Sequence, residues 1–244
     1  MSGSEAGPDT PFDADGDLGN LIRHDDREDL MAAVAALTAD ALRAALAARG
    51  KATLAVAGGS TPGPFFDRLA EAELDWARVT IMPTDERLVE PGSPRRNETL
   101  IRSRLMTARA APAQYLSFAD PLTLRDPDHG TARLQMAVAE HLPLDLVVLG
   151  MGEDLHTASL FPGADRLTMA LAEDAPAAMV LRAPGVPEPR VSLTLPVLLG
   201  ARRRVLLLAG AEKMAALRRA HSPGPVAQGP VRAVLPVTEI HYAP

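Results

Sequence analysis

A histidine and an aspartate stand close together in the segment 150–163, whose sequence is GMGEDLHTASLFPG. His156 follows an apolar run at residues 144–149, and Asp154 lies two residues before it. A histidine in this position can act as a general base, and we expect the start of a short helix beyond it to favour the neutral imidazole. Asp154 is near enough to orient the ring. The alternative is a polar loop histidine with no catalytic role.

A glycine-rich turn is the second candidate site. Gly58 and Gly59 follow an apolar run at residues 53–57, and Ser60 and Thr61 precede a predicted helix. Glycines let a ligand approach the backbone closely, and the free N–H groups of a helix N-terminus attract an anion. The pattern is compatible with phosphate binding and equally with an ordinary turn capped by Ser or Thr.

Charged residues lie at the ends of further predicted strands. Asp85 and Arg87 follow the run at residues 79–83, and Arg190 begins the run at residues 190–193. An arginine can hold phosphate oxygens with two hydrogen bonds, and a carboxylate can accept hydrogen bonds from a polyol. These residues are candidates for binding a phosphate or a polyol, but the charged segment taken by itself favours the alternative, a solvated loop.

Lysine is rare in this chain, since Lys51 and Lys213 are the only lysines among 25 basic residues. Lys213 follows the apolar run at residues 204–209. A lysine kept in an arginine-rich chain hints at a need for a compact ammonium group, for example at a phosphate. A solvated lysine in the first turn of a helix is the alternative.

The elements that would position these residues alternate along the chain. Helices are predicted over residues 29–49, 61–72, 98–108, 132–141 and 212–220, and strands over 53–57, 79–83, 144–149, 179–182, 190–193, 204–209 and 233–235. This alternation is typical of a single α/β domain with a mostly parallel, Rossmann-like sheet and helices on both faces. Such sheets bind ligands at the carboxyl ends of their strands, where the segments that begin at Gly58, Asp85, Gly150 and Gly210 stand.

Composition limits the class of protein. Residues 1–20 are rich in Gly, Asp, Ser and Pro and are predicted to form a disordered or loosely ordered tail before a domain at residues 21–244. The net charge of −6 is not that of a nucleic-acid-binding protein. The absence of cysteine excludes disulfides and thiolate chemistry. No metal-ligand pattern and no uncharged apolar span of about 18 residues is recognisable, so we expect a cytoplasmic protein without a metal or a membrane segment.

Taken together, the motifs resemble those of bacterial 6-phosphogluconolactonases, in the glucosamine-6-phosphate isomerase/6-phosphogluconolactonase superfamily. The strings that carry the resemblance lie between about residues 28 and 235, and in chain order they are AGGSTP, TDERLV, RRNETL, GMGEDLHTASLFPG, RVSLTLP and GAEK. HTASLFPG is the most specific of them, because the related glucosamine-6-phosphate deaminases carry a different sequence after the same histidine. GGSTP and the lysine motif occur in both groups.

The resemblance implies a cofactor-free hydrolase that converts 6-phospho-D-glucono-1,5-lactone to 6-phospho-D-gluconate in the oxidative pentose phosphate pathway. His156 would be the general base on water, with Asp154 as its acidic neighbour. The residues that would contact the phosphate and the sugar are Gly59, Ser60, Thr61, Arg87, Arg190 and Lys213. The resemblance does not identify the oxyanion donors, and the backbone N–H groups of residues 150–152 are candidates for them.

The chain departs from the resembled family at one position. Leu155 stands between Asp154 and His156, where the family has glycine. If the backbone there needs a positive φ, leucine costs about 1–2 kcal/mol.

Two other functions are kept as alternatives. A sugar-phosphate isomerase or deaminase of the same superfamily would use Asp85 to remove a C2 proton, and the HTASLFPG string argues against it. A non-catalytic sugar-phosphate-binding domain would be expected to carry a DNA-binding module, for which the acidic N-terminus is too short. We expect a phosphorylated sugar lactone as the partner, no nucleic acid or membrane, and a monomer or small homo-oligomer.

Overall fold

The computed structural model describes Leu18 and residues 20–244. The rest of the predicted tail, residues 1–17 and Gly19, lies outside the described residues. Leu18 and Asn20 pack on the folded domain: the Leu18 side chain belongs to the hydrophobic core, and the Asn20 carbonyl accepts a hydrogen bond from the Ile240 amide at 2.9 Å.

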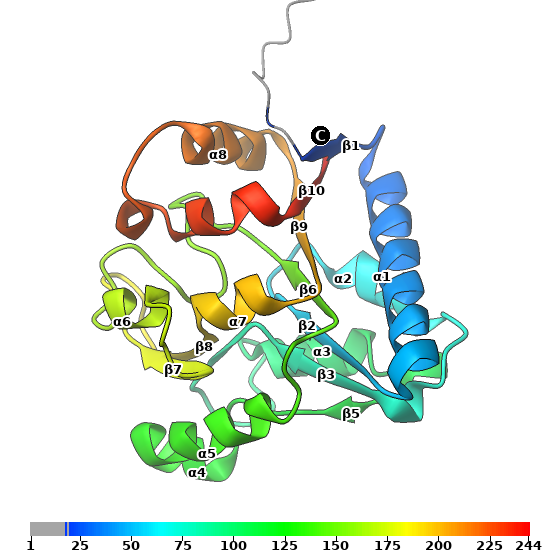
Figure 1. Cartoon of the computed structure of the whole chain (residues 1–244), viewed down its shortest axis with the longest axis horizontal. Helices are drawn as coiled ribbons and strands as arrows, with labels where there is room; N and C mark the ends of the chain where they lie inside the picture. The colour runs from blue at the N-terminus through cyan, green and yellow to red at the C-terminus, as the bar shows by residue number, and fades with distance from the viewer. Residues whose placement is uncertain (1–17, 19) are drawn as a thin grey trace, which may run out of the picture.

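The centre of the molecule is a seven-stranded sheet in which every neighbouring pair of strands is parallel (Figure 1). Its strands in spatial order are β1 (Leu21–Arg23), β10 (Glu239–Ala243), β9 (Arg203–Ala209), β6 (Leu146–Leu149), β2 (Ala52–Val56), β3 (Val79–Pro83) and β5 (Gln114–Tyr115). The chain runs outward from β2 to β5 and then returns to β6 on the other side of β2. The strand order therefore reverses between β2 and β6, and a reversal of this kind opens a crevice at the carboxyl ends of the strands.

Side chains of the central strands alternate between two hydrophobic clusters. In β6, Leu146 and Val148 belong to one cluster, whereas Val147 and Leu149 belong to the other. Because successive side chains of a strand point to opposite faces, both faces of the sheet are buried. This confirms the predicted parallel α/β sheet with helices on both faces.

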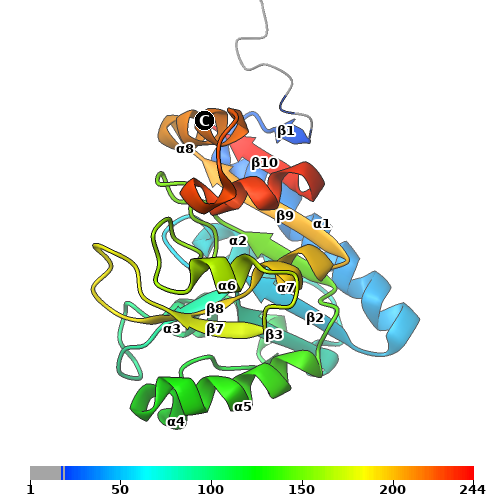
Figure 2. The ribbon, with the colours of Figure 1, turned by 60° about the vertical axis from the view of Figure 1, so that its left-hand side comes forward.

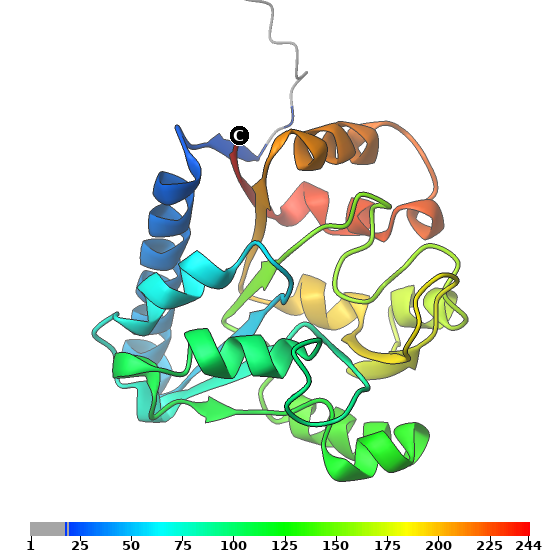
Figure 3. The same cartoon turned by 180° about the vertical axis from the view of Figure 1, so that it is seen from behind.

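The helices divide between these two clusters. Helices α1 (Arg27–Arg49), α2 (Gly63–Ala70) and α3 (Asn97–Arg104) contribute to one, and Figure 3 shows α2 and α3 in front of the sheet. Helices α5 (Pro127–Ala139), α6 (Leu167–Leu171), α7 (Leu195–Gly200) and α8 (Ala211–His221) contribute to the other, and α4 (Pro121–Arg125) packs beside α5.

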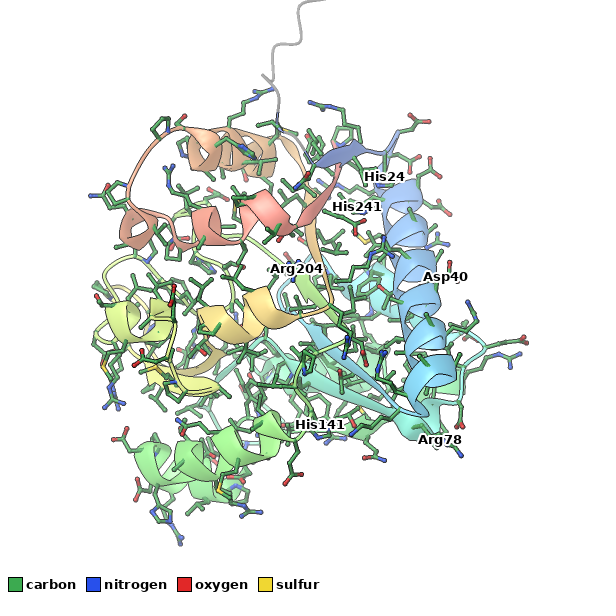
Figure 4. All side chains as sticks on the ribbon, viewed as in Figure 1. His24, Asp40, Arg78, His141, Arg204 and His241 are labelled. Carbon is green, nitrogen blue, oxygen red and sulfur yellow. The ribbon has the colours of Figure 1, made fainter. Side chains whose placement is uncertain are left out.

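Helix α1 is the one helix in the described part of the chain that is long and apolar enough, by length and composition, to cross a membrane. Its residues Leu30, Val34 and Leu42 are fully buried. Asp40, labelled on this helix in Figure 4, is exposed and pairs with Arg43. The apolar face of α1 is thus part of the protein core.

Two predicted strands lie in a second sheet. β7 (Ala178–Leu181) and β8 (Arg190–Leu193) form an antiparallel sheet with β4 (Asp85–Arg87), which the sequence indicated as a polar loop. Figure 2 shows β7 and β8 between α6 and the α4–α5 pair. In this small sheet Asp85 lies opposite Ser192 and Arg87 lies opposite Arg190. The pairing brings two predicted site segments together.

The strand predicted at residues 233–235 is wrong. Ala233 ends the 3₁₀ turn Pro230–Ala233, Leu235 begins the 3₁₀ turn Leu235–Val237, and Val234 joins the two. The last strand is β10. Pro230 and Pro236 have no N–H to donate to a sheet. Val234 and Leu235 are apolar because they are buried in a turn, and a short apolar run does not distinguish a buried turn from a strand.

Candidate active site

A pocket of about 220 Å³ lies at the carboxyl ends of the central strands. The loops after β2, β3, β6 and β9 meet there, as expected for parallel neighbours. Nine of the ten residues predicted for the site line this pocket: Gly58, Gly59, Ser60, Thr61, Asp85, Arg87, His156, Arg190 and Lys213. The tenth, Asp154, does not line it and instead contacts His156.

Asp154 and His156 form a hydrogen-bonded pair. Nδ1 of His156 lies 2.5 Å from Oδ1 of Asp154. Because a carboxylate only accepts, Nδ1 carries the proton, and Nε2 is left as the acceptor of the neutral ring. Burial raises the pKa of Asp154, but hydrogen bonding and charge attraction from His156 outweigh it and the net pKa is lowered. Asp154 is therefore ionised at neutral pH.

The loop backbone is shaped around the His156 ring. A Cβ atom on Gly152 would lie 2.1 Å from Nδ1 of His156, so only glycine fits at this position. The Phe161 ring stacks on the imidazole, with centroids 4.0 Å apart and planes inclined by 30°. Contacts with the Gly152 backbone and with the Phe161 ring thus fix the imidazole.

The short helix expected beyond His156 is absent. The next helix, α6, begins at Leu167, and Thr157 and Leu160 form an isolated antiparallel bridge. The helix-dipole argument for the neutral imidazole does not apply, and the hydrogen bond from Nδ1 to Asp154 sets the ring orientation instead. Thr157 further ties the loop to the end of β6, since its hydroxyl donates to the Gly150 carbonyl at 2.9 Å.

Leu155 adopts the left-handed conformation, with a φ of 68°. This is the position at which the resembled family has glycine. The Leu155 carbonyl accepts from the Val231 amide at 3.1 Å, and its side chain is buried. A Cβ atom on Gly229 would lie 3.0 Å from Cδ1 of Leu155, so the C-terminal segment packs directly against it. The backbone at this position thus has a conformation suited to glycine, but the residue is a leucine with a buried side chain.

The Gly152 amide is not available as an oxyanion donor. The Gly152 amide donates to the His156 carbonyl at 3.0 Å, so this N–H closes the loop and is not free to bind an oxyanion. The prediction of oxyanion donors at residues 150–152 therefore stands only for Gly150 and Met151, both of which line the pocket.

The glycine turn faces the pocket from the end of β2. Gly59 has a φ of 94°, which explains glycine there. Helix α2 begins after Pro62 without a side-chain capping bond, so neither Ser60 nor Thr61 is used as a cap. The capped turn considered from the sequence is not formed, and both hydroxyl side chains line the pocket.

Asn97 is a pocket residue that the sequence did not single out. Its Nδ2 donates to the Asp85 carbonyl at 2.7 Å, and a Cβ atom on Gly58 would lie 1.9 Å from its Oδ1. An asparagine at the start of a predicted helix is typical of a cap and gives no signal for a binding site. Its place in the pocket follows from contacts with Gly58 and Asp85, which are distant in sequence.

Glu86 positions the backbone of Arg87 and Asn97. Its fully buried carboxylate accepts hydrogen bonds from the amides of Arg87, Asn97 and Glu98 at 2.7–2.8 Å. Burial raises the pKa of Glu86, although the three N–H donors oppose the shift. Glu86 closes the loop between β4 and α3, and this closure fixes the backbones that carry Arg87 and Asn97.

Two arginines and one carboxylate also line the pocket. Nη1 of Arg190 lies 3.7 Å from Oδ2 of Asp85, and Arg87 donates from Nη1 to the Arg95 carbonyl at 2.5 Å. Burial lowers the pKa of Arg190 and nearby Asp85 opposes this, but a guanidinium stays charged in proteins. Nε of Arg87 lies 3.9 Å from Oε1 of Glu188.

Lys213 completes the charges of the pocket. It lies in the first turn of α8, which begins after Gly210, a residue with a φ of 97°. Among the lining residues Arg87, Arg190 and Lys213 are cationic and Asp85 is anionic. The pocket is therefore locally positive in a chain with a net charge of −6, and an anionic ligand fits it. In Leu18 and residues 20–244, no group of three or more acidic or histidine side chains is arranged to hold a metal ion.

Known proteins match this chain over nearly all its described length. Residues 25–242 match the family model described as glucosamine-6-phosphate isomerases/6-phosphogluconolactonase. A 6-phosphogluconolactonase of Rhizobium meliloti is 40% identical over 83% of this chain and 89% of its own length. One of Pseudomonas aeruginosa is 37% identical over 86% of this chain and 89% of its own. A solved 6-phosphogluconolactonase structure from Shewanella baltica has a TM-score of 0.87 and 32% identity, covering 92% of this chain and 97% of that one.

Proposed function

The chain belongs to the glucosamine-6-phosphate isomerase/6-phosphogluconolactonase family, and from this premise we propose that it hydrolyses 6-phospho-D-glucono-1,5-lactone to 6-phospho-D-gluconate with His156 as general base. Relatives named 6-phosphogluconolactonase that are 40% and 37% identical over more than four fifths of the chain support the reaction. The observation that carries the mechanism is the placement of the Asp154–His156 pair at a cationic pocket.

The first contribution of the pocket is to bind and orient. The phosphate is attracted by Arg87, Arg190 and Lys213 and by the turn that carries Ser60 and Thr61. Binding energy at the phosphate, remote from the reacting carbon, is used to hold C1 of the lactone beside His156. Asp85 and Asn97 offer a carboxylate and an amide to the ring hydroxyls.

The second contribution is proton transfer. Nε2 of His156 accepts a proton from water as the water oxygen attacks C1 of the lactone. The ionised Asp154 stabilises the imidazolium that forms, through the bond to Nδ1. As the C1–O5 bond breaks, the imidazolium returns its proton to the ring oxygen, which becomes the 5-hydroxyl of the product. A cyclic ester needs no covalent enzyme intermediate for this reaction.

The isomerase or deaminase alternative requires Asp85 to be a free base. Both of its carboxylate oxygens already accept hydrogen bonds, from Thr84 at 3.2 Å and from Ser159 at 2.5 Å. This arrangement supports a binding role for Asp85.

A lactonase assay with freshly generated 6-phosphogluconolactone, corrected for the uncatalysed rate, tests the proposal. We expect acceleration of lactone opening and no release of ammonia from glucosamine 6-phosphate. Lactone opening at the uncatalysed rate would refute the proposed reaction, and ammonia release would establish the alternative. The cytoplasmic location, the monomeric or small homo-oligomeric state and the lack of nucleic-acid and membrane partners stay predictions.

A further inference from the structure

Ser159 is a fully buried residue outside the predicted site. Its hydroxyl donates to Oδ2 of Asp85 at 2.5 Å, across 74 positions in the chain. Its amide donates to the Ser192 hydroxyl at 3.0 Å, and that hydroxyl donates onward to the Leu193 carbonyl at 2.9 Å. Strand β8 therefore fixes the Ser159 backbone, and the Ser159 hydroxyl is directed at the Asp85 carboxylate.

The Asp85 carboxylate lines the pocket but is held from several sides. Thr84 donates to Oδ1 at 3.2 Å, and the Arg190 guanidinium lies 3.7 Å from Oδ2. The Asp85 carbonyl also accepts from Asn97. A carboxylate oxygen has about two acceptor positions, and Oδ1 uses one of them for Thr84, so it can accept a further hydrogen bond from a ligand. The contacts with Thr84, Ser159 and Arg190 fix the orientation of this carboxylate at the pocket.

The loop that carries Ser159 also carries His156. This loop holds two non-glycine residues at positive φ, Leu155 at 68° and Ala158 at 48°. Strained backbone of this kind persists only where surrounding contacts determine it. The bond from Ser159 to Asp85 is such a contact, and it joins the histidine loop to strand β4.

We propose that Ser159 is a positioning residue that holds the Asp85 carboxylate as a fixed acceptor for a ring hydroxyl of the substrate. The same bond fixes the position of Asp85 relative to His156, because Ser159 and His156 lie on one loop. The proposal rests on the proposed lactonase function. It assigns Ser159 no contact with the substrate, so its effect passes through Asp85. Loss of the Ser159 hydroxyl should therefore weaken substrate binding more than it slows the chemical step.

The experiment is a double-mutant cycle of Ser159→Ala and Asp85→Asn. We expect Ser159→Ala to raise KM for the lactone and Kd for 6-phosphogluconate about tenfold, the loss of roughly one hydrogen bond to a charged group. The kcat should fall less than about threefold. The double variant should bind no more weakly than Asp85→Asn alone, because a residue acting through Asp85 has no further effect once the carboxylate is gone.

Thr194→Val is the matched control, since Thr194 is also fully buried and its hydroxyl donates to the Pro176 carbonyl outside the pocket. It should lower thermal stability without changing KM. If Ser159→Ala does not fold, Ser159→Cys, which keeps a weaker donor, should give an intermediate KM. An unchanged KM in the folded Ser159 variant, or effects that multiply in the double variant, would overturn the positioning role. The activity of the unaltered protein tests the lactonase function separately. If that protein is active, either of these two results refutes only the positioning role; if it is inactive, the lactonase function itself is refuted.

Discussion

The Asp154 carboxylate binds His156 twice: Oδ1 accepts from the ring Nδ1 at 2.5 Å and from the backbone amide at 3.3 Å. A single oxygen thus fixes both the ring and the start of the loop that follows. When Nε2 takes a proton, both ring nitrogens share the positive charge, and the Asp154 carboxylate lies beside Nδ1. The pair has the orientation and the charge that a general base needs.

Replacing His156 with alanine should lower kcat by about two to four orders of magnitude, the usual contribution of a general base. Binding of 6-phosphogluconate should change little, because the cations of the pocket remain. Steady-state kinetics and calorimetry measure the two quantities. His129→Ala is the control, since His129 is exposed on α5. An unchanged kcat in folded His156→Ala would remove this residue from the mechanism.

Replacing Arg87 or Lys213 with alanine should weaken binding of the phosphorylated lactone by about 1.5–3 kcal/mol per charge-assisted hydrogen bond. Unphosphorylated gluconolactone should be affected much less, because it lacks the anion that these cations attract. The ratio of kcat/KM for the two substrates measures the difference. Lys51→Ala, a change at the opposite end of β2, is the control. Equal losses for both substrates would show that neither residue contacts the phosphate.

Leu155→Gly and Leu155→Ala form a matched pair, because both remove the buried side chain and only alanine keeps a Cβ atom at a φ of 68°. We expect both variants to be less stable than the unaltered protein, since the lost packing of a buried leucine, about 2–5 kcal/mol, exceeds the relief of strain. The glycine variant should be about 1 kcal/mol more stable than the alanine variant. Denaturant unfolding measures both differences.

The lactonase activity of Leu155→Gly should be preserved, because glycine can adopt the conformation that the loop already has. An alanine variant at least as stable as the glycine variant would contradict the strain at this position. A large gain in kcat for Leu155→Gly, from an unaltered protein with almost none, would show that leucine displaces His156 from its working position.

Stability should depend on pH through His241. Its Nδ1 lies 3.0 Å from Nε2 of His24, and Figure 4 labels both residues. Burial lowers the pKa of His241, the His24 and Arg203 charges lower it further, and Glu239 opposes the shift. The unfolded chain therefore binds this proton more readily than the folded one. The stabilisation is complete above about pH 6.5 and is lost as the pH falls through the folded pKa.

Urea unfolding at pH 7.5 and pH 5.5 checks this dependence. The unaltered protein should lose stability at the lower pH, and His241→Asn should lose less. Part of the loss should remain in this variant, because burial also lowers the pKa of His141 and of His221. Equal losses in the two proteins would contradict the assignment to His241.

The sequence by itself determined the parallel core and the ends of strands where the ligand groups stand. Strand β3 and strand β8 have the predicted bounds, Val79–Pro83 and Arg190–Leu193. Local signals suffice there, because both segments are short runs rich in apolar and β-branched residues. Parallel pairing then brings the loops after β2, β3, β6 and β9 to one edge.

The tertiary structure decided what the local signals could not. The polar segment Asp85–Arg87 becomes a strand only because β8 pairs with it. Asn97 and Ser159 bind Asp85 through hydrogen bonds that span 12 and 74 positions. The strand β10 has little local signal and forms between β1 and β9. Composition and spacing indicate only the local environment of a residue, that is, its neighbours in the sequence. The contacts named here form between segments that are distant in the sequence, so the packing of the whole fold decides them.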